Sequence, residues 1–291
     1  MFKLKLNRKQ QLQIAVPATV MFVLLTFALL GVKIFGSTKP EERHLMHMDF
    51  NPLQRCNTPL DSVLGYASEI PAISNCHRHW TSESDAYAAM GYPDDVVKGK
   101  PYSSLRQYVY TGSCWNADEF VNRYIFLTRA IMAYFGGGKH EDYWSSLTFF
   151  GSSGMHRKYQ RIDLMNGMTV KTLKGRKKHA PRVGDIVVWK RDFQRYFERG
   201  HVAVVVKVEG DAAAAGGETR LAELQKEQQH PLLVYIAEQN FDNKHWMGRN
   251  FSRVLKFSWK SGNQAVIEDP DGPPIKGHAR VGKLLYHNEE F

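Results

Sequence analysis

The sequence predicts an α+β fold in which N-terminal helices pack on a mostly antiparallel sheet. The first observation is a set of apolar residues spaced three or four positions apart after Gly112, which is typical of one face of a helix. Those residues are Phe120, Tyr124, Leu127, Ile131 and Phe135. The second is that β-branched, nearly uncharged runs dominate the later half of the chain. The third is an uncharged apolar run near the N-terminus, which places one transmembrane helix ahead of the fold.

The composition is that of a globular protein with a basic surface. The chain has 291 residues, 43% of them apolar and 12% aromatic, which is enough for one large or two small domains. Its net charge is +10, and four of those charges precede the first apolar run, leaving +6 for the rest. A basic run spans residues 171–182 without interleaved aromatic residues. We therefore predict a solvated loop or a contact with an acidic protein there, and no nucleic-acid partner.

Residues 1–13 form a basic tail, and residues 14–35 are predicted to form the transmembrane helix. Its uncharged core of 19 residues spans about 28 Å as a helix, close to the hydrocarbon thickness of a bilayer. A secretory signal peptide is the alternative, but the run is long for a signal core and its end is a poor cleavage site. The basic tail predicts that the N-terminus stays on the inner side, with membrane lipid as the partner of residues 14–35. Residues 36–58 are predicted to be an irregular linker.

The globular region is predicted to span residues 59–291. Its opening is expected to contain a short helix or turn over 59–67 and an extended segment over 71–75. The main helix is expected over 117–135, with Asn116 at the N-cap, acidic side chains in the first turn and a glycine run at its end.

The rest of the globular region is expected to alternate strands with insertions. Residues 139–160 are predicted to hold another short helix and a loop. Insertions are expected near 139–180 and near 209–231, the second with a short exposed helix. The predicted strands occupy residues 181–189, 200–208, 232–238, 250–257 and 275–285.

The residues that point to chemistry lie at the helix start and at two strand ends. A cysteine at a helix N-terminus is a good nucleophile, but this chain has Ala117 at that place and Cys114 three residues earlier. His201 opens one predicted strand and Glu238 ends the next, so an antiparallel pairing puts them side by side. A histidine oriented by an acid is the base of a cysteine amidase. Taken singly, a turn histidine and a solvated glutamate are the plainer interpretations.

Several segments together resemble the CHAP amidases, which are cysteine- and histidine-dependent amidohydrolases and peptidases. The resemblance is closest to the amidase domain of glutathionylspermidine and trypanothione synthetases and runs over residues 59–282. It implies a papain-like fold. The segments that carry it are 64–67, 71–75, 184–189, 200–203 and 236–240.

The helix start departs from that family's pattern. Tyr110-Thr-Gly112 and Trp115 fix the register, so the resemblance implies that Ala117 occupies the nucleophile position, while His201 as base and Glu238 as orienting acid are kept. Without a nucleophile, covalent catalysis loses orders of magnitude in rate. The resemblance also implies a substrate pocket. Its predicted residues are Trp115, Asn116, Arg123 and Asn240.

These features give three hypotheses. The first is a catalytically inactive amidase-like protein, anchored by one helix and serving as an accessory subunit of a larger membrane complex, with a respiratory complex of the mitochondrial inner membrane as our expectation. The second is a thiol amidase for the glutathionylspermidine or trypanothione amide bond, which is either an engineered cysteine-to-alanine form or a user of Cys114. The third is a protein that binds a glutathionyl-polyamine without turnover.

Three further motifs are weaker. A bridge between Cys56 and Cys76 is compatible with an oxidising compartment, but the sequence leaves it open. The motif Cys76-His-Arg-His79, with His44 and His47, has metal-ligand side chains at no recognised spacing, so we predict no metal and no cofactor. Asn250-Phe-Ser252 is a glycosylation sequon, but it falls on a predicted strand.

Overall fold

The computed structural model describes residues 56–78, 82, 84–101, 106–136, 141–152 and 154–287. The chain divides into two compact units, Met1–Phe50 and Asn51–Phe291, and every described residue belongs to the second. The basic tail, the predicted transmembrane helix at 14–35 and most of the linker lie outside the described residues. Within the described ranges, no helix is long and apolar enough to cross a membrane.

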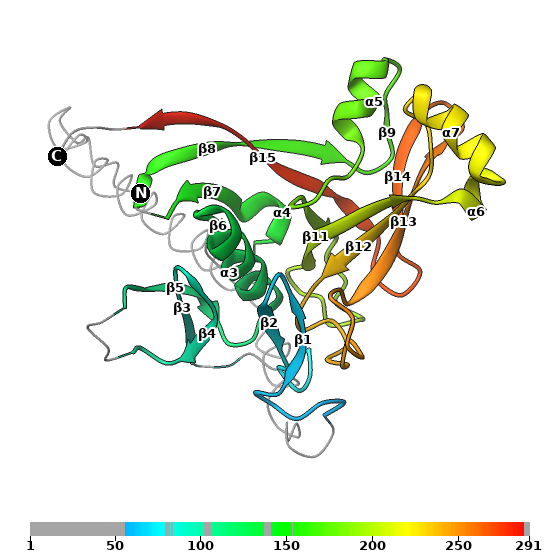
Figure 1. Cartoon of the computed structure of the whole chain (residues 1–291). Coiled ribbons are helices and arrows are strands. Elements are labelled where there is room, and N and C mark those ends of the chain that lie inside the picture. Colours follow the sequence, from blue (N-terminus) through cyan, green and yellow to red (C-terminus); the bar gives the residue numbers. More distant parts are fainter. Residues whose placement is uncertain are drawn as a thin grey trace, which may run out of the picture. The chain divides into compact units, whose positions relative to one another are not determined.

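In the described part of the chain, ten strands form one sheet, and every neighbouring pair in it is antiparallel (Figure 1). Strands expected from the sequence form its centre, which confirms the mostly antiparallel sheet. In spatial order the strands are β6 (Ile131–Phe135), β7 (Leu147–Gly151), β8 (Gly154–Met165), β15 (Ile275–His287), β10 (Ile186–Trp189), β11 (His201–Gly210), β12 (Leu232–Ala237), β13 (Arg253–Lys260), β14 (Gln264–Glu268) and β9 (Met168–Thr169).

Two smaller sheets precede the main helix. The hairpin of β1 (Val63–Ala67) and β2 (Ile70–Ile73) replaces the helix or turn expected over 59–67. A three-stranded sheet with the order β4-β3-β5 follows it and was not foreseen. Its strands are β3 (Asp85–Ala89), β4 (Tyr92–Lys98) and β5 (Tyr108–Ser113). The prediction of several N-terminal helices is therefore wrong for the described residues, because strands fill that part of the fold.

The main helix, α3 (Ala117–Arg129), is shorter than the predicted 117–135. It ends because Ala130 takes a left-handed conformation (φ 54°) and donates its N–H to the Phe126 carbonyl. The chain then continues as β6, in which Ile131 is buried. A spacing of four residues fits one face of a helix and one face of a strand alike, so the apolar pattern did not mark this boundary.

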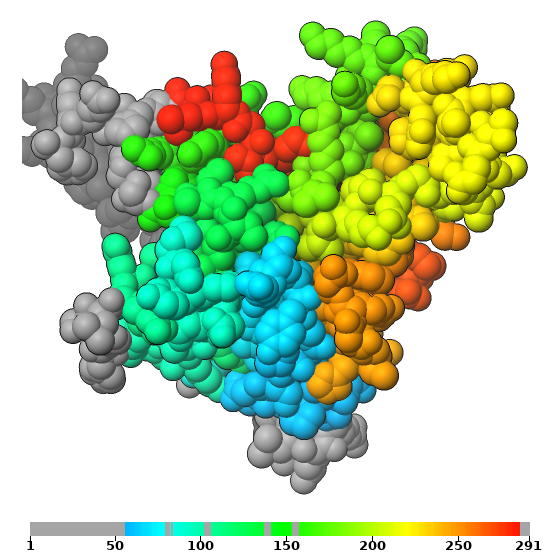
Figure 2. Space-filling view, viewed as in Figure 1, coloured from blue at the N-terminus to red at the C-terminus, as the bar shows by residue number. Residues whose placement is uncertain are grey.

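The other helices are short. They are α4 (Tyr143–Ser146), α5 (Leu173–His179), α6 (Ala212–Ala215) and α7 (Glu218–Lys226). α4 confirms the short helix expected within 139–160, but β7 and β8 replace the loop expected beside it. The basic run at 171–182 contains α5, and Arg176, Lys177 and Lys178 fall in the last turn of this helix, where the helix dipole favours cations. The insertion at 209–231 forms α6 and α7, which lie at the molecular surface in Figure 2 (yellow).

The core lies on both faces of the central strands. Along β10, Ile186 and Val188 pack into the cluster that contains α3, whereas Val187 and Trp189 pack into a second cluster on the other face. All four side chains are buried, as alternation along a doubly covered strand requires. The sheet therefore holds α3 against the start of β11, where the predicted chemistry lies.

Candidate active site

His201 is the first residue of β11, where it pairs with Trp189 of β10. The preceding Gly200 has φ +88°, and a Cβ there would lie 2.3 Å from the Trp189 carbonyl oxygen. Only glycine fits that turn, which explains why a Gly-His pair opens this strand. The imidazole of His201 is directed into the protein and is 2% exposed.

Glu238 lies next to His201 because β11 and β12 are antiparallel. Val204 pairs with Ala237, so the start of β11 runs beside the segment that leaves β12. The His201 Nε2 atom is 2.8 Å from Glu238 Oε2. Glu238 is 3% exposed, so the hydrogen bond is shielded from water. The structure therefore brings the predicted base and the predicted orienting acid together.

The carboxyl group of Glu238 is ionised. Burial alone raises its pKa, but the Arg253 guanidinium and the hydrogen bond with His201 outweigh burial and lower the pKa to about 2. An ionised carboxylate only accepts hydrogen bonds, so Nε2 of His201 carries the proton and Nδ1 keeps its lone pair. Burial also lowers the pKa of His201 below its ordinary value, despite the raising effect of Glu238. The imidazole is therefore a neutral base.

Arg253 at the start of β13 holds Glu238 in place. Its Nε and Nη2 atoms donate to the two Glu238 oxygens over 2.5 and 3.1 Å. Its Nη1 atom donates to Asp269, which also accepts a hydrogen bond of 2.8 Å from Trp189 Nε1. The sequence did not single out Arg253 and Asp269 as parts of the site. The available signal was an arginine within the predicted strand 250–257, which follows the strand that ends at Glu238.

Two contacts connect the start of α3 to the residues next to His201 and Glu238. Arg199, two residues before His201, lies 3.8 Å from the Asp118 carboxylate. Gln239, the neighbour of Glu238, donates its Nε2 to the Asn116 carbonyl over 3.0 Å. Asn116 stands at the N-cap as predicted, although its side chain makes no capping hydrogen bond.

Ala117 is the first residue of α3 and is 4% exposed. The helix start that it occupies is the one held beside the His201–Glu238 pair by the contacts of its two neighbours. A methyl group has no lone pair, so this position offers nothing that can attack a carbonyl carbon.

Cys114, the other nucleophile considered from the sequence, lies in surroundings that disfavour a thiolate. It is fully buried and packs with Ile73, Ala86 and Trp115, in a cluster separate from the one that contains Ala117. Burial, reinforced by the charge of Glu119, raises the pKa of the Cys114 thiol to about 12. A thiol with this pKa is almost entirely protonated near neutral pH and is a poor nucleophile.

The other residues predicted for a substrate pocket make internal contacts. Trp115 is buried and donates its Nε1 to Asp61 over 2.6 Å. Arg123 is fully buried, pairs with Glu119 at 2.7 Å and donates to the Pro71 carbonyl, so it supports the core rather than lining an open pocket. Asn240 is partly exposed, adopts φ 59° and accepts a hydrogen bond from Asn243.

Three aromatic rings enclose the His201 imidazole. The ring centroids of Trp189, Phe197 and Phe241 lie 5.1, 5.7 and 5.2 Å from that of His201. Phe197 and Phe241 also contact each other, with centroids 5.6 Å apart, and both are nearly buried. We call these two rings the aromatic lid. Together with the low exposure of His201 and Ala117, they give a site that is closed to a bulky substrate.

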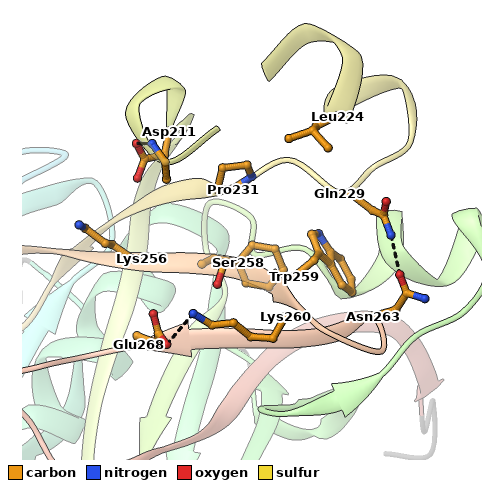
Figure 3. A pocket seen from close by; sticks show the side chains of 12 residues that line it. Asp211, Leu224, Gln229, Pro231, Lys256, Ser258, Trp259, Lys260, Asn263 and Glu268 are labelled. Atoms are coloured by element: carbon orange, nitrogen blue, oxygen red, sulfur yellow. Dashed lines mark hydrogen bonds and ion pairs between the residues drawn. The ribbon is translucent and has the colours of Figure 1, made fainter. Parts of the chain in front are cut away.

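An open pocket of about 490 Å³ lies elsewhere, between α7 and the hairpin of β13 and β14 (Figure 3). Trp259, Ser258 and the Lys260–Glu268 ion pair form part of its wall, and neither His201 nor Ala117 lines it. It is therefore separate from the histidine site.

Cys56 and Cys76 form a disulfide, so the bridge that the sequence left open is present. Cys76 is thereby unavailable as a thiolate ligand, and His44, His47 and His79 lie outside the described residues. Among the residues that the structure describes, no cluster of three metal-ligating side chains occurs.

None of the curated proteins compared with the chain matches it. A comparison with family models matches residues 105–221 to the CHAP domain. This segment contains α3 with Ala117 and the start of β11 with His201, and it ends before Glu238. Together with the antiparallel sheet behind a single long helix, the match places a CHAP domain, with the fold of amidases and peptidases, at residues 105–221 of this chain.

Proposed function

We propose that this chain is a catalytically silent CHAP-domain protein that acts as a structural or accessory subunit of a larger membrane assembly. The observation that carries the proposal is Ala117, a methyl group at the helix start beside an otherwise ordered His201–Glu238 pair. Thiol-dependent amide hydrolysis needs a sulfur atom at that place, and removing a covalent nucleophile lowers the rate by orders of magnitude.

Two further features support the absence of catalytic activity. The Cys114 thiol is buried, protonated and part of another cluster, so it does not replace the missing sulfur. The aromatic lid leaves His201 only 2% exposed, which restricts the approach of an amide substrate. A domain whose histidine is enclosed in this way suits a role in assembly better than one in turnover.

The membrane part of the proposal rests on the sequence. The uncharged run within residues 14–35 supports a single-pass anchor with the N-terminus on the inner side, and we propose the mitochondrial inner membrane as its location. The partners are then protein subunits of a membrane complex. Native gel electrophoresis after mild detergent extraction tests this: the protein should migrate with a multi-subunit complex, and migration as a lone chain contradicts it.

The catalytic part is tested with the full chain in detergent and glutathionylspermidine as substrate. We expect no hydrolysis above the buffer rate. Hydrolysis by the unchanged protein that disappears in His201→Ala would overturn the proposal. The Ala117→Cys variant distinguishes two causes of inactivity. Activity in that variant means that only the sulfur atom is missing. Inactivity means that the aromatic lid and the substrate pocket have also been remodelled.

The ordered His201–Glu238 hydrogen bond favours one alternative. An intact base is what a working thiol amidase retains, so a cysteine at position 117 in the unmodified gene would make this chain an engineered form of an amidase for glutathionyl-polyamine bonds. The nucleotide sequence of codon 117 decides between the two. Binding of such a ligand without turnover is a third possibility, and calorimetric titration with glutathionylspermidine tests it.

A further inference from the structure

Arg78 caps the aromatic lid from outside. It follows β2 and stands two residues after Cys76, whose disulfide ties this segment to Cys56. The Arg78 guanidinium carbon lies 4.5 Å from the centroid of the Phe197 ring and 5.2 Å from that of Phe241. Its Nη1 atom donates to the Arg195 carbonyl over 3.3 Å. Arg78 itself is only half-buried, so it sits between the lid and the solvent.

This arrangement has the parts of a site for organic cations. Two aromatic faces attract a cation through their quadrupoles, and a backbone carbonyl accepts one of its N–H groups. Burial has the largest effect on the pKa of Arg78 and lowers it. The carboxylates of Asp242 and Glu238 raise that pKa and so attract a cation, while Arg253 and Arg195 lower it.

The local charge depends on Arg78. Four carboxylates lie in this region. Glu238 and Asp269 share Arg253, Asp242 lies 3.5 Å from the ammonium group of Lys244, and Asp192 lies 3.6 Å from the Arg195 guanidinium. With Arg78 present, the four negative charges meet four positive ones. Without it, one negative charge is left over beside two aromatic rings, which favours entry of a monovalent cation.

We propose that the outer face of the aromatic lid is a binding site for the guanidinium or alkylammonium group of a ligand, and that Arg78 fills it as an internal plug. The occupant that these contacts fit is a small organic cation, because they comprise two aromatic rings and one backbone carbonyl. The proposal goes beyond the silent catalytic site, because it concerns the outside of the lid and holds whether or not His201 has a nucleophile.

A tethered plug competes strongly with a free ligand. A cation–π contact by itself supports only weak binding of a free ligand. Arg78 is present at a high effective concentration, because the disulfide holds its segment beside the lid. Free cations should therefore bind the unchanged protein far more weakly than a variant that lacks the plug.

The test compares the full chain in detergent with Arg78→Ala, using methylguanidinium as the probe and methylurea as its neutral counterpart. Thermal unfolding and calorimetric titration report binding. We expect saturable binding of methylguanidinium to Arg78→Ala, at least tenfold tighter than to the unchanged protein, and no response to methylurea. Arg220→Ala, which removes an arginine from the exposed face of α7, is the matched control and should behave like the unchanged protein.

Two additional variants keep the result decisive. Arg78→Gln retains the stem of the side chain and takes the place of Arg78→Ala if the latter does not fold. Phe241→Leu combined with the plug-free variant should abolish binding, because it removes one aromatic face. Equal responses of the plug-free and unchanged proteins, or equal responses to methylguanidinium and methylurea, would overturn the proposal.

Discussion

His201 and Glu238 form a buried hydrogen bond of 2.8 Å that links the start of β11 to the segment leaving β12. The carboxylate fixes the proton on Nε2, and the surrounding aromatic rings keep the imidazole neutral. This is the arrangement of a general base with its orienting acid, yet the adjacent helix begins with Ala117. Under the proposed function, His201 is the base of a thiol amidase whose nucleophile position is filled by a methyl group.

The protonation state of His201 gives the first prediction. Its imidazole should be mostly neutral at pH 6.5, with the proton on Nε2, because burial disfavours the charged form and lowers the pKa. Nitrogen-15 chemical shifts of the histidine rings, followed as a function of pH, measure both the tautomer and the pKa. In Glu238→Gln the pKa should fall further, because the carboxylate that favours the imidazolium is lost. A His201 pKa at or above 6.5 in the unchanged protein contradicts the arrangement.

The second prediction concerns stability in acid. The folded-state pKa of Glu238 is lowered from 4.5 to about 2, so its contribution is complete above the unfolded-state pKa and disappears as the pH falls through the folded-state value. That contribution is on the order of 3 kcal/mol in the free energy of unfolding. Urea unfolding of the unchanged protein and Glu238→Gln should show a stability difference at pH 7 that narrows between pH 5 and pH 2. A difference that is independent of pH would show that Glu238 is not ionised in the folded protein.

The sequence was sufficient to place these two residues together. A β-branched run after Gly200 and another before Glu238 define two strands, and antiparallel pairing necessarily brings the start of one beside the end of the other. Hydrophobic runs bounded by turn residues indicate buried strands. For this reason the central strands were predicted near their observed positions. The helix start at Ala117 was located for a similar reason, since acids in the first turn mark a helix N-terminus.

Other features depend on tertiary contacts that a single sequence does not encode locally. Ile131 and Phe135 fit a helix and a strand equally well, and pairing with β7 decides for the strand. The polar, aromatic segment at 85–113 forms a sheet because β3 is paired on both sides. Arg253 is an ordinary exposed-type residue in the sequence, and only the register of β12 with β13 brings it to Glu238.

Asn250 illustrates how a strand boundary changes an interpretation. The strand expected from residue 250 begins at Arg253, so Asn250 lies in an exposed bend rather than within the sheet. The objection that the sequon falls on a strand is therefore removed. Ser252 of the same motif is buried and donates to the Ile236 carbonyl, so its hydroxyl is engaged in the folded domain.

The third prediction concerns the buried ion pair in α3. Arg123 and Glu119 are both fully buried, 2.7 Å apart, and Glu119 also accepts hydrogen bonds from Thr111 and Gln239. Removing one charge leaves the other uncompensated in the core, which costs about 3–5 kcal/mol. Arg123→Met and Glu119→Gln should each lower the free energy of unfolding by this amount, measured by urea denaturation. The double variant should be clearly more stable than the sum of the two single losses predicts; additive losses would show that the two groups act independently.

The disulfide gives the fourth prediction. Cys56 and Cys76 are separated by 20 residues. A disulfide that closes a loop of this length lowers the conformational entropy of the unfolded chain and so stabilises the folded state by about 3 kcal/mol. Cys56→Ser should lower the unfolding temperature by several degrees, and a reducing agent should have the same effect on the unchanged protein but none on the variant. Peptide mapping under non-reducing conditions should recover the two segments joined. Separate peptides, or a variant as stable as the unchanged protein, would show that the bridge is absent in solution.

The last prediction concerns Cys114, because a reactive thiol there would revive the amidase hypothesis. Burial raises its pKa to about 12, so the thiolate that reacts with iodoacetamide is almost absent at pH 8. Under non-reducing conditions, mass spectrometry should detect no adduct on the folded protein and one adduct in denaturant, since the other two cysteines are bridged. Cys114→Ser, the control, should give none in either condition. Rapid labelling of the folded protein would mean that this thiol is accessible and ionised, and it would then have to be considered as a nucleophile for His201 to activate.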